Sequence, residues 1–155
     1  MDFKLPVLSF PEYPFKLRKK KEVDEIFDSI RKKYVRLTPE EWVRQNIIMY
    51  LIHEKRFPVS RISVEHALKY NQLSRRADIV FFGKYGQPLL VTECKAPEIK
   101  INQGVFDQVV RYNYVLKVKY IMVSNGIQNY CCEVDYEKQK CNFLNDIPEY
   151  SIMHD

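Results

Sequence analysis

Residues Arg76–Lys95 have the sequence RADIVFFGKYGQPLLVTECK, and this stretch decides the fold that we predict for the chain. It contains two hydrophobic runs, Ala77–Phe82 and Leu89–Lys95, on either side of a turn with Gly86 and Pro88. Hydrophobic runs of this length around a turn with Gly and Pro are typical of a β-hairpin. We therefore expect two antiparallel strands here.

Three charged side chains, Asp78, Glu93 and Lys95, interrupt these strands. Because side chains alternate between the faces of a strand, Glu93 and Lys95 share one face, about 7 Å apart. Asp78 joins them if the hairpin register allows it, and the sequence leaves that register open. Buried charges are costly unless they pair or bind a metal. The alternative is a half-exposed hairpin whose charges form a weak surface ion pair.

A divalent cation would offset the cost of burying the two carboxylates. Mg²⁺ prefers oxygen ligands, which Asp78 and Glu93 supply, and the backbone carbonyl of Cys94 offers a third. Lys95 would then lie beside the metal, where an amine orients or deprotonates water or stabilises developing negative charge. This pattern predicts hydrolysis of a phosphodiester with Mg²⁺, for which Mn²⁺ would substitute.

Composition limits the class of protein. The 155 residues suit one domain, 1–155, and 46% hydrophobic with 29% charged residues is ordinary for a soluble protein. The longest apolar run, Ile47–Ile52, is far shorter than the ~20 residues that span a bilayer, and no signal peptide is evident. We expect a cytoplasmic protein without membrane contact. Its four cysteines lack zinc-ligand spacing, so we expect them to be reduced packing residues.

The net charge of +5 is compatible with nucleic-acid binding without requiring it. Basic residues gather in two clusters, Lys16–Lys21 and Arg31–Arg36, with acidic residues between them. Each cluster is either a solvated surface or a surface that contacts phosphates.

The remaining elements follow from capping and periodicity. Residues 1–14 contain three prolines and predict an extended arm, and apolar spacing from Val23 predicts a helix, although Tyr34 and Val35 favour a strand. A helix is predicted to start after Thr38 and to run to about Glu54. Thr38 suits the N-cap, Pro39 suits the first helical position, and Glu41 at the third position completes a capping box.

Beyond Pro58 we expect a strand within 59–69, the hairpin, a helix over 103–116, a strand over 119–124, and a terminal antiparallel pair formed by 130–132 and 142–144. The fold class is therefore α/β, or α+β in some schemes, with the order α-β-β-β-α-β and a mixed sheet between helices. This core spans 38–124, with an N-terminal extension over 1–37 and C-terminal strands and a tail over 125–155.

The spacing of Asp78, Glu93 and Lys95, on this order of elements, resembles the PD-(D/E)XK nuclease superfamily and its restriction-endonuclease-like core, with Ala77 where Pro is frequent. A further Q-x-x-x-Y element, Gln108–Tyr112, lies on the second predicted helix. The segments LTPEEWVRQ, RRADIV, LLVTECKAP, FDQVVRYN and VSNG resemble the N-terminal nuclease domain of type I restriction enzyme R subunits, especially free-standing Bacteroidetes-type relatives.

The resemblance implies a DNA endonuclease of bacterial restriction-modification in which Asp78, Glu93 and Lys95 bind Mg²⁺ and cut DNA. It also implies that Gln108 reaches the site or DNA, supported by Tyr112. Glu41, which corresponds to an acidic residue of the first helix, would help to position metal or water. Further nucleic-acid contacts implied by position are Arg44, Arg76, Lys100 and Tyr112, although each arginine or lysine is equally well explained as a solvated residue.

R subunits of this kind carry an ATP-driven motor, whereas this chain has no G-x-x-x-x-G-K-[ST] motif and no room for a motor. We therefore expect it to act on DNA alone or with a separate motor or specificity subunit. Cleavage of both strands would favour a homodimer or two successive nicks. The alternative is a catalytically silent module that binds nucleic acid or a protein partner on the same fold.

Overall fold

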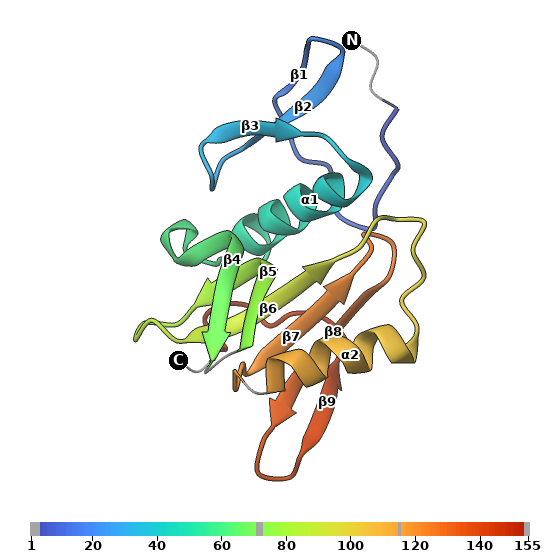
Figure 1. The fold of residues 1–155 in the computed structure, drawn as a ribbon. Helices are drawn as coiled ribbons and strands as arrows, with labels where there is room; N and C mark the ends of the chain where they lie inside the picture. The colour runs from blue at the N-terminus through green and yellow to red at the C-terminus, as the bar shows by residue number, and fades with distance from the viewer. Residues whose placement is uncertain (1–3, 71–72, 115, 154–155) are drawn as a thin grey trace.

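The computed structural model describes residues 4–70, 73–114 and 116–153, with only the backbone described at 70, 73–75 and 112 (Figure 1). Three strands precede the first helix: β1 (Leu17–Lys20), β2 (Val23–Asp28) and β3 (Lys33–Arg36). The remaining elements are α1 (Pro39–His53), the 3₁₀ turn η1 (Val59–Arg61), β4 (Ile62–Tyr70), β5 (Leu73–Phe82), β6 (Pro88–Cys94), α2 (Gln103–Tyr114), β7 (Tyr120–Ser124), β8 (Asn129–Asp135) and β9 (Lys140–Leu144).

The main sheet has six strands in the order β4-β5-β6-β7-β8-β9. Strands β6 and β7 are parallel, and the other neighbouring pairs are antiparallel. Two parallel strands need a crossover connection, which α2 supplies (Figure 1). The predicted α-β-β-β-α-β order, the hairpin and the mixed sheet are confirmed.

The two helices cover opposite faces of this sheet (Figure 1). Val43 and Ile47 of α1 belong to one buried cluster with Met122 of β7. Phe106 and Val109 of α2 belong to a second cluster, formed with neighbouring sheet positions that include Ile121 and Val123. Adjacent Cys131 and Cys132 fall into different clusters, and all four cysteines are free, as the sequence predicts.

The predicted helix from Val23 is wrong, because this segment forms the antiparallel strands β2 and β3. Asp28 ends β2 and accepts hydrogen bonds from the backbone amides of Ile30 and Arg31, which turns the chain. Phe27 and Tyr34 then lie opposite each other, with ring centroids 5.2 Å apart. Cross-strand pairing of aromatic side chains therefore prevailed over helical spacing.

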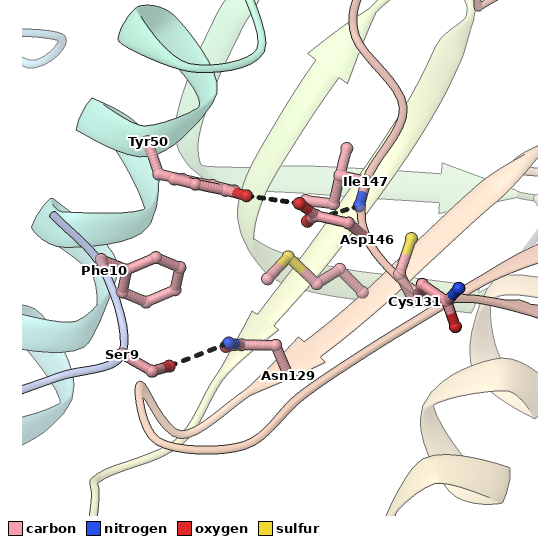
Figure 2. A pocket seen from close by; sticks show the side chains of 9 residues that line it. Ser9, Phe10, Tyr50, Asn129, Cys131, Asp146 and Ile147 are labelled. Carbon is pink, nitrogen blue, oxygen red and sulfur yellow. Dashed lines mark hydrogen bonds between the residues drawn. The ribbon is translucent and has the colours of Figure 1, made fainter.

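The N-terminal arm lies beside the α1 face of the sheet, as expected. Its Leu8 and Phe10 pack against the core, and the amide of Ser9 donates to the Gly126 carbonyl at 2.8 Å. A pocket of about 290 Å³ lies between the arm, α1, the β7–β8 strands and the segment after β9 (Figure 2). In this pocket the Tyr50 hydroxyl donates to Asp146 Oδ2 at 2.6 Å. Within the part of the chain described above, no helix is long and apolar enough to cross a membrane.

Helix α1 begins as predicted, because Thr38 Oγ1 accepts a hydrogen bond from the amide of Glu41 at 3.0 Å. It ends at His53, one residue before the predicted end. The carboxylate of Glu41, however, accepts hydrogen bonds from arginine and glutamine side chains, including Arg31 at 2.6 Å. The N-terminus of α1 is therefore fixed by its cap while its first turn contributes charge to a network.

We predict that Thr38→Ala lowers the free energy of unfolding by about 1 kcal/mol, because the Glu41 amide loses its acceptor. Urea denaturation monitored by circular dichroism measures this change. Thr38→Ser keeps the hydroxyl and should retain most of the stability. Equal losses in both variants would show that the hydroxyl does not stabilise the helix.

Candidate active site

Asp78 lies where the pairing of β5 with β6 ends. The antiparallel pairs run from Phe82 and Pro88 to Ile79 and Thr92, and Asp78 is the next residue on β5. Its Oδ2 accepts a hydrogen bond from the backbone amide of Cys94 at 2.7 Å, in place of a backbone acceptor. The register that the sequence left open therefore brings Asp78 beside the segment that carries Glu93 and Lys95.

Arg44 of α1 holds the other oxygen of this carboxylate. Its Nη2 donates to Asp78 Oδ1 at 3.1 Å, and its Nη1 donates to Glu41 Oε1 at 3.2 Å. Glu65 and Glu40 lie 3.4 and 4.0 Å from the same guanidinium. Arg44 is only 5% exposed, so it is a counter-ion within the protein and not the solvated or phosphate-contacting residue considered from the sequence. Burial opposes its charge, yet Glu41 and Asp78 raise its pKa above the ordinary value.

Glu65 reaches this cluster through an irregularity of β4. Pairing with β5 joins Val64 to Ile79 and His66 to Ala77, and it skips Glu65, whose φ is +52°. This left-handed conformation interrupts the alternation of side chains along the strand. The Glu65 carboxylate lies 3.4 Å from both Arg31 and Arg44. Regular alternation of side chains does not predict that Glu65 lies beside Arg44, and Glu65 was not among the candidate site residues from the sequence.

A second arginine connects the three-stranded sheet to the site. Arg31, in the β2–β3 turn, donates to Asp28 Oδ2 and Glu41 Oε1, both at 2.6 Å. Gln45 of α1 donates to Asp28 and Glu41 at 2.9 and 3.2 Å. Asp28 is fully buried, and although burial favours its neutral form, the donors from Arg31, Gln45 and Ile30 lower its pKa.

Glu40 is the acidic residue of α1 whose pKa is affected by the charges of both Asp78 and Lys95. Its side chain is 48% exposed. Burial and the charge of Asp78 raise the pKa of Glu40, while Arg44 and Lys95 act in the opposite direction. Glu41, the acid chosen from the sequence, is instead paired with Arg31 and Arg44. Its catalytic role stays a prediction, and Glu40 is the neighbour that the sequence analysis passed over.

Glu93 and Lys95 lie at the end of β6. Lys95 Nζ is 3.9 Å from Glu93 Oε1, and the backbone amide of Lys95 donates to the Ser124 carbonyl at 2.8 Å. The Lys95 side chain is 34% exposed and the Glu93 side chain is 16% exposed, so solvent reaches both. Between them, burial and the nearby Asp78 carboxylate raise the pKa of the Cys94 thiol well above its ordinary value. The Cys94 side chain is buried in the core cluster that packs against α1, so its backbone carbonyl is the group of Cys94 considered as a metal ligand.

The cluster as a whole is rich in carboxylates. Its acidic residues in the described part of the chain lie near the cationic side chains of Arg31, Arg44 and Lys95; they are Asp28, Glu40, Glu41, Glu65, Asp78 and Glu93. Asp78 uses two of the roughly four acceptor positions of a carboxylate.

This donor set fits Mg²⁺, which is usually bound through one or two carboxylates and completes its coordination with water and phosphate oxygens. Asp78 and Glu93 would supply the carboxylates. Among the described residues, no group of three His, Cys, Asp or Glu side chains is arranged to hold a metal. Binding of Mg²⁺ at Asp78 and Glu93 therefore stays a prediction.

The other residues singled out from the sequence lie on β5, on α2 and in the segment between β6 and α2. Arg76 on β5, Lys100 before α2, and Gln108 on α2 are exposed. The backbone of Tyr112 belongs to α2, but its side chain lies outside the described residues. Their contacts with nucleic acid stay predictions.

We predict that Asp28→Asn lowers the free energy of unfolding at pH 7 by roughly 2 kcal/mol or more, because Arg31 loses a buried charged partner. The pKa of Asp28 is lowered in the folded protein. Its contribution is therefore complete above the ordinary carboxyl pKa, near 4, and disappears as the pH falls through the lower folded value. Urea denaturation between pH 7 and the lowest pH at which the protein folds checks this.

The control is Asp24→Asn, which removes a partner of Lys19 that is 44% exposed and should change stability by less than about 1 kcal/mol. A gap between wild type and Asp28→Asn that stays constant, or widens, in acid would contradict the predicted direction.

Comparison with known proteins places this arrangement in a family. Residues 39–148 match the family model described as type I restriction enzyme R protein N terminus (HSDR_N). No curated protein matches the sequence. One similar solved structure is a fragment of a putative HsdR subunit of a type I restriction enzyme from Vibrio vulnificus YJ016, with 20% identity and a TM-score of 0.49. The match covers 72% of this chain and 24% of that chain. Since the family model matches more than half of the chain, including the segment that carries Asp78, Glu93 and Lys95, the chain belongs to the family of type I restriction enzyme R protein N-terminal domains.

Proposed function

We propose that this protein is a Mg²⁺-dependent endonuclease that hydrolyses phosphodiester bonds of DNA at the cluster around Asp78. The observation that carries the proposal is a carboxylate-rich cluster at the end of the hairpin, where Asp78 pairs with Arg44 and the solvent-accessible Lys95 lies 3.9 Å from Glu93. Such a cluster repels the phosphates of DNA, so substrate requires a divalent cation between the two. Mn²⁺, which suits the same oxygen ligands, would substitute.

Asp78, Glu93 and the Cys94 carbonyl would hold the ion. When bound, Mg²⁺ polarises a phosphoryl oxygen and lowers the pKa of a water molecule. Lys95, 3.9 Å from Glu93, would orient the attacking water or donate a hydrogen bond to the negative charge that develops on the phosphoryl group. Arg44 would act as a positioning residue, because its hydrogen bond at 3.1 Å fixes the Asp78 carboxylate.

Exposed basic side chains would attract DNA to the protein. The β1–β3 sheet carries exposed Lys20, Lys21 and Lys33, and Arg31 anchors its β2–β3 turn to the acidic cluster. Arg76 and Lys100 are exposed on the main sheet and on the loop before α2. Contacts of this kind strengthen binding without reading base sequence.

The family assignment supports a role in restriction of DNA in the bacterial cytoplasm. The family is described as the N terminus of the R protein, which is one component of type I restriction enzymes. We therefore include a separate motor or specificity subunit among the proposed partners. A homodimer would place two sites on one duplex and allow cleavage of both strands.

A silent binding module is the second candidate. It is favoured by the pairing of Arg44 with Asp78, which keeps the carboxylate satisfied without a metal. Such a protein would retain DNA or a partner through its basic surfaces and would not need Lys95.

We predict that the purified protein nicks supercoiled plasmid in Mg²⁺ or Mn²⁺ and that EDTA abolishes nicking. Asp78→Asn and Lys95→Ala should each lower the rate at least about 100-fold, since each removes a group acting at the reacting phosphate. Gel electrophoresis of timed samples measures the rates.

Lys84→Ala provides the matched control, because Lys84 lies in the turn at the opposite end of β6 and should leave cleavage unchanged. Retention of plasmid in a gel shift with no cleavage by wild type would replace the nuclease with the silent module.

We predict that the two acids of α1 have separate roles. Glu40→Gln should weaken activation by Mg²⁺, raising the metal concentration for half-maximal cleavage, with little change in stability, because its carboxylate is half-exposed. Glu41→Gln should instead lower stability, since Arg31 and Arg44 both lose a buried partner. Metal titration of cleavage and thermal melting separate the effects. A stable Glu41→Gln variant that has lost metal activation would restore Glu41 as the acid of the site.

A further inference from the structure

An aromatic groove lies on the α2 side of the main sheet, outside the acidic cluster. Its volume is about 190 Å³, and its lining comprises Ile101, Asn102, Gln103, Phe106, Tyr130 and Phe143. The Phe106 and Phe143 ring centroids are 5.0 Å apart, and those of Phe106 and Tyr130 are 6.4 Å apart. Phe143 is 57% exposed and Tyr130 is 36% exposed, so aromatic surface faces solvent.

Strand register connects this groove to the proposed active site. Glu93 of β6 pairs with Val123 of β7, and Val123 pairs with Tyr130 of β8. Residues directly opposite each other on neighbouring strands share one face of the sheet. Neighbouring strands lie about 4.8 Å apart, which places the backbones of Glu93 and Tyr130 about 10 Å apart. This distance corresponds to about three stacked nucleotide steps of 3.4 Å.

The second aromatic residue is placed on the same face. Phe143 of β9 pairs with Cys132 of β8, which is packed in the cluster beneath α2. The groove and α2 therefore lie on one face of the sheet, and Tyr130 is two strands away from Glu93 in the same register. Phe143 and Tyr130 line the groove as partly exposed rings, and Phe106, which is 4% exposed, supports them from within.

The groove also has polar groups at its rim. Asn102 caps α2 by accepting from the Val105 amide at 2.9 Å, and Gln103 donates to Asp107 at 2.8 Å. Exposed Lys100 lies two residues before Asn102 and supplies a positive charge for a phosphate, whereas Asp107 is the acidic group of this rim. A volume of 190 Å³ is below the 300 Å³ or more of pockets for drug-sized ligands, so it suits a single ring system.

We propose that this groove binds an unpaired nucleobase of the DNA strand that enters the active site, stacked on Phe143 and Tyr130. Every base has a π-face, and stacking on aromatic side chains binds single strands with little sequence preference. The inference rests on the proposed nuclease function and adds the form of the substrate: single-stranded DNA, or duplex DNA that has opened near the cut.

The test measures binding of a fluorescent single-stranded oligonucleotide by anisotropy, in EDTA so that no cleavage occurs. Phe143→Ala should weaken binding about five-fold or more, the lower end of the contribution of one stacked base. Phe143→Trp should retain affinity, and its fluorescence should be quenched on binding, beyond any change from Trp42, the one native tryptophan. An oligonucleotide of the same length with abasic positions should bind wild type more weakly and should not distinguish Phe143→Ala from wild type.

Tyr85→Ala is the matched control, because Tyr85 is 79% exposed in the turn at the far end of the hairpin and should leave affinity unchanged. Melting temperatures of all variants establish that they are folded.

Equal affinity of wild type and Phe143→Ala, or equal affinity for intact and abasic strands, would overturn the assignment. The assignment would also be overturned if analytical ultracentrifugation shows that wild type is a dimer and Phe143→Ala is a monomer, because a second copy of the chain would then occupy the groove. In those cases the nuclease proposal would still stand if wild type cleaves plasmid and Asp78→Asn does not. Conversely, if the binding changes occur as expected but wild type does not cleave DNA, the base-binding groove would be supported and the nuclease proposal would be contradicted.

Discussion

The carboxylate of Asp78 is the group on which the proposed site depends, because it connects β5, helix α1 and the segment that carries Glu93 and Lys95. One oxygen accepts from the Cys94 amide at 2.7 Å, and the other accepts from Arg44 at 3.1 Å. Removing a charged partner from such a buried network leaves the remaining charges uncompensated. The pairing of β5 with β6, the position of α1 and the placement of Lys95 are therefore linked through one side chain.

Much of the fold follows from local patterns. The hairpin around Gly86, the cap at Thr38 and the crossover between β6 and β7 each have a short-range signal, and all were predictable. The segment from Val23 was not, because helical spacing of apolar residues competes with the strand preference of Tyr34 and Val35. In the structure, Phe27 pairs with Tyr34 across β2 and β3, and Asp28 is buried, turns the chain between them and accepts a hydrogen bond from Gln45 of α1; periodicity expresses none of these contacts.

The candidate site, like the fold, could be predicted from the sequence only in part. Asp78, Glu93 and Lys95 stand out in the sequence because charge interrupts hydrophobic strands, although their catalytic roles stay predictions. Glu65 joins the cluster through a left-handed backbone conformation in the middle of a strand, which side-chain alternation does not foresee. The sequence did not predict that Arg44 is buried. Two of its four carboxylate partners, Glu65 and Asp78, are distant in sequence, and the other two, Glu40 and Glu41, fit the ordinary first turn of a helix.

We propose that this carboxylate-rich cluster holds a divalent cation at Asp78 and Glu93. Isothermal titration calorimetry of the purified protein with Mn²⁺, and with Mg²⁺ in parallel, measures that binding without relying on cleavage. Saturable binding to wild type that is lost in Asp78→Asn and in Glu93→Gln, both folded, is the expected result. The absence of binding to wild type, or binding that both substitutions leave unchanged, would contradict the claim.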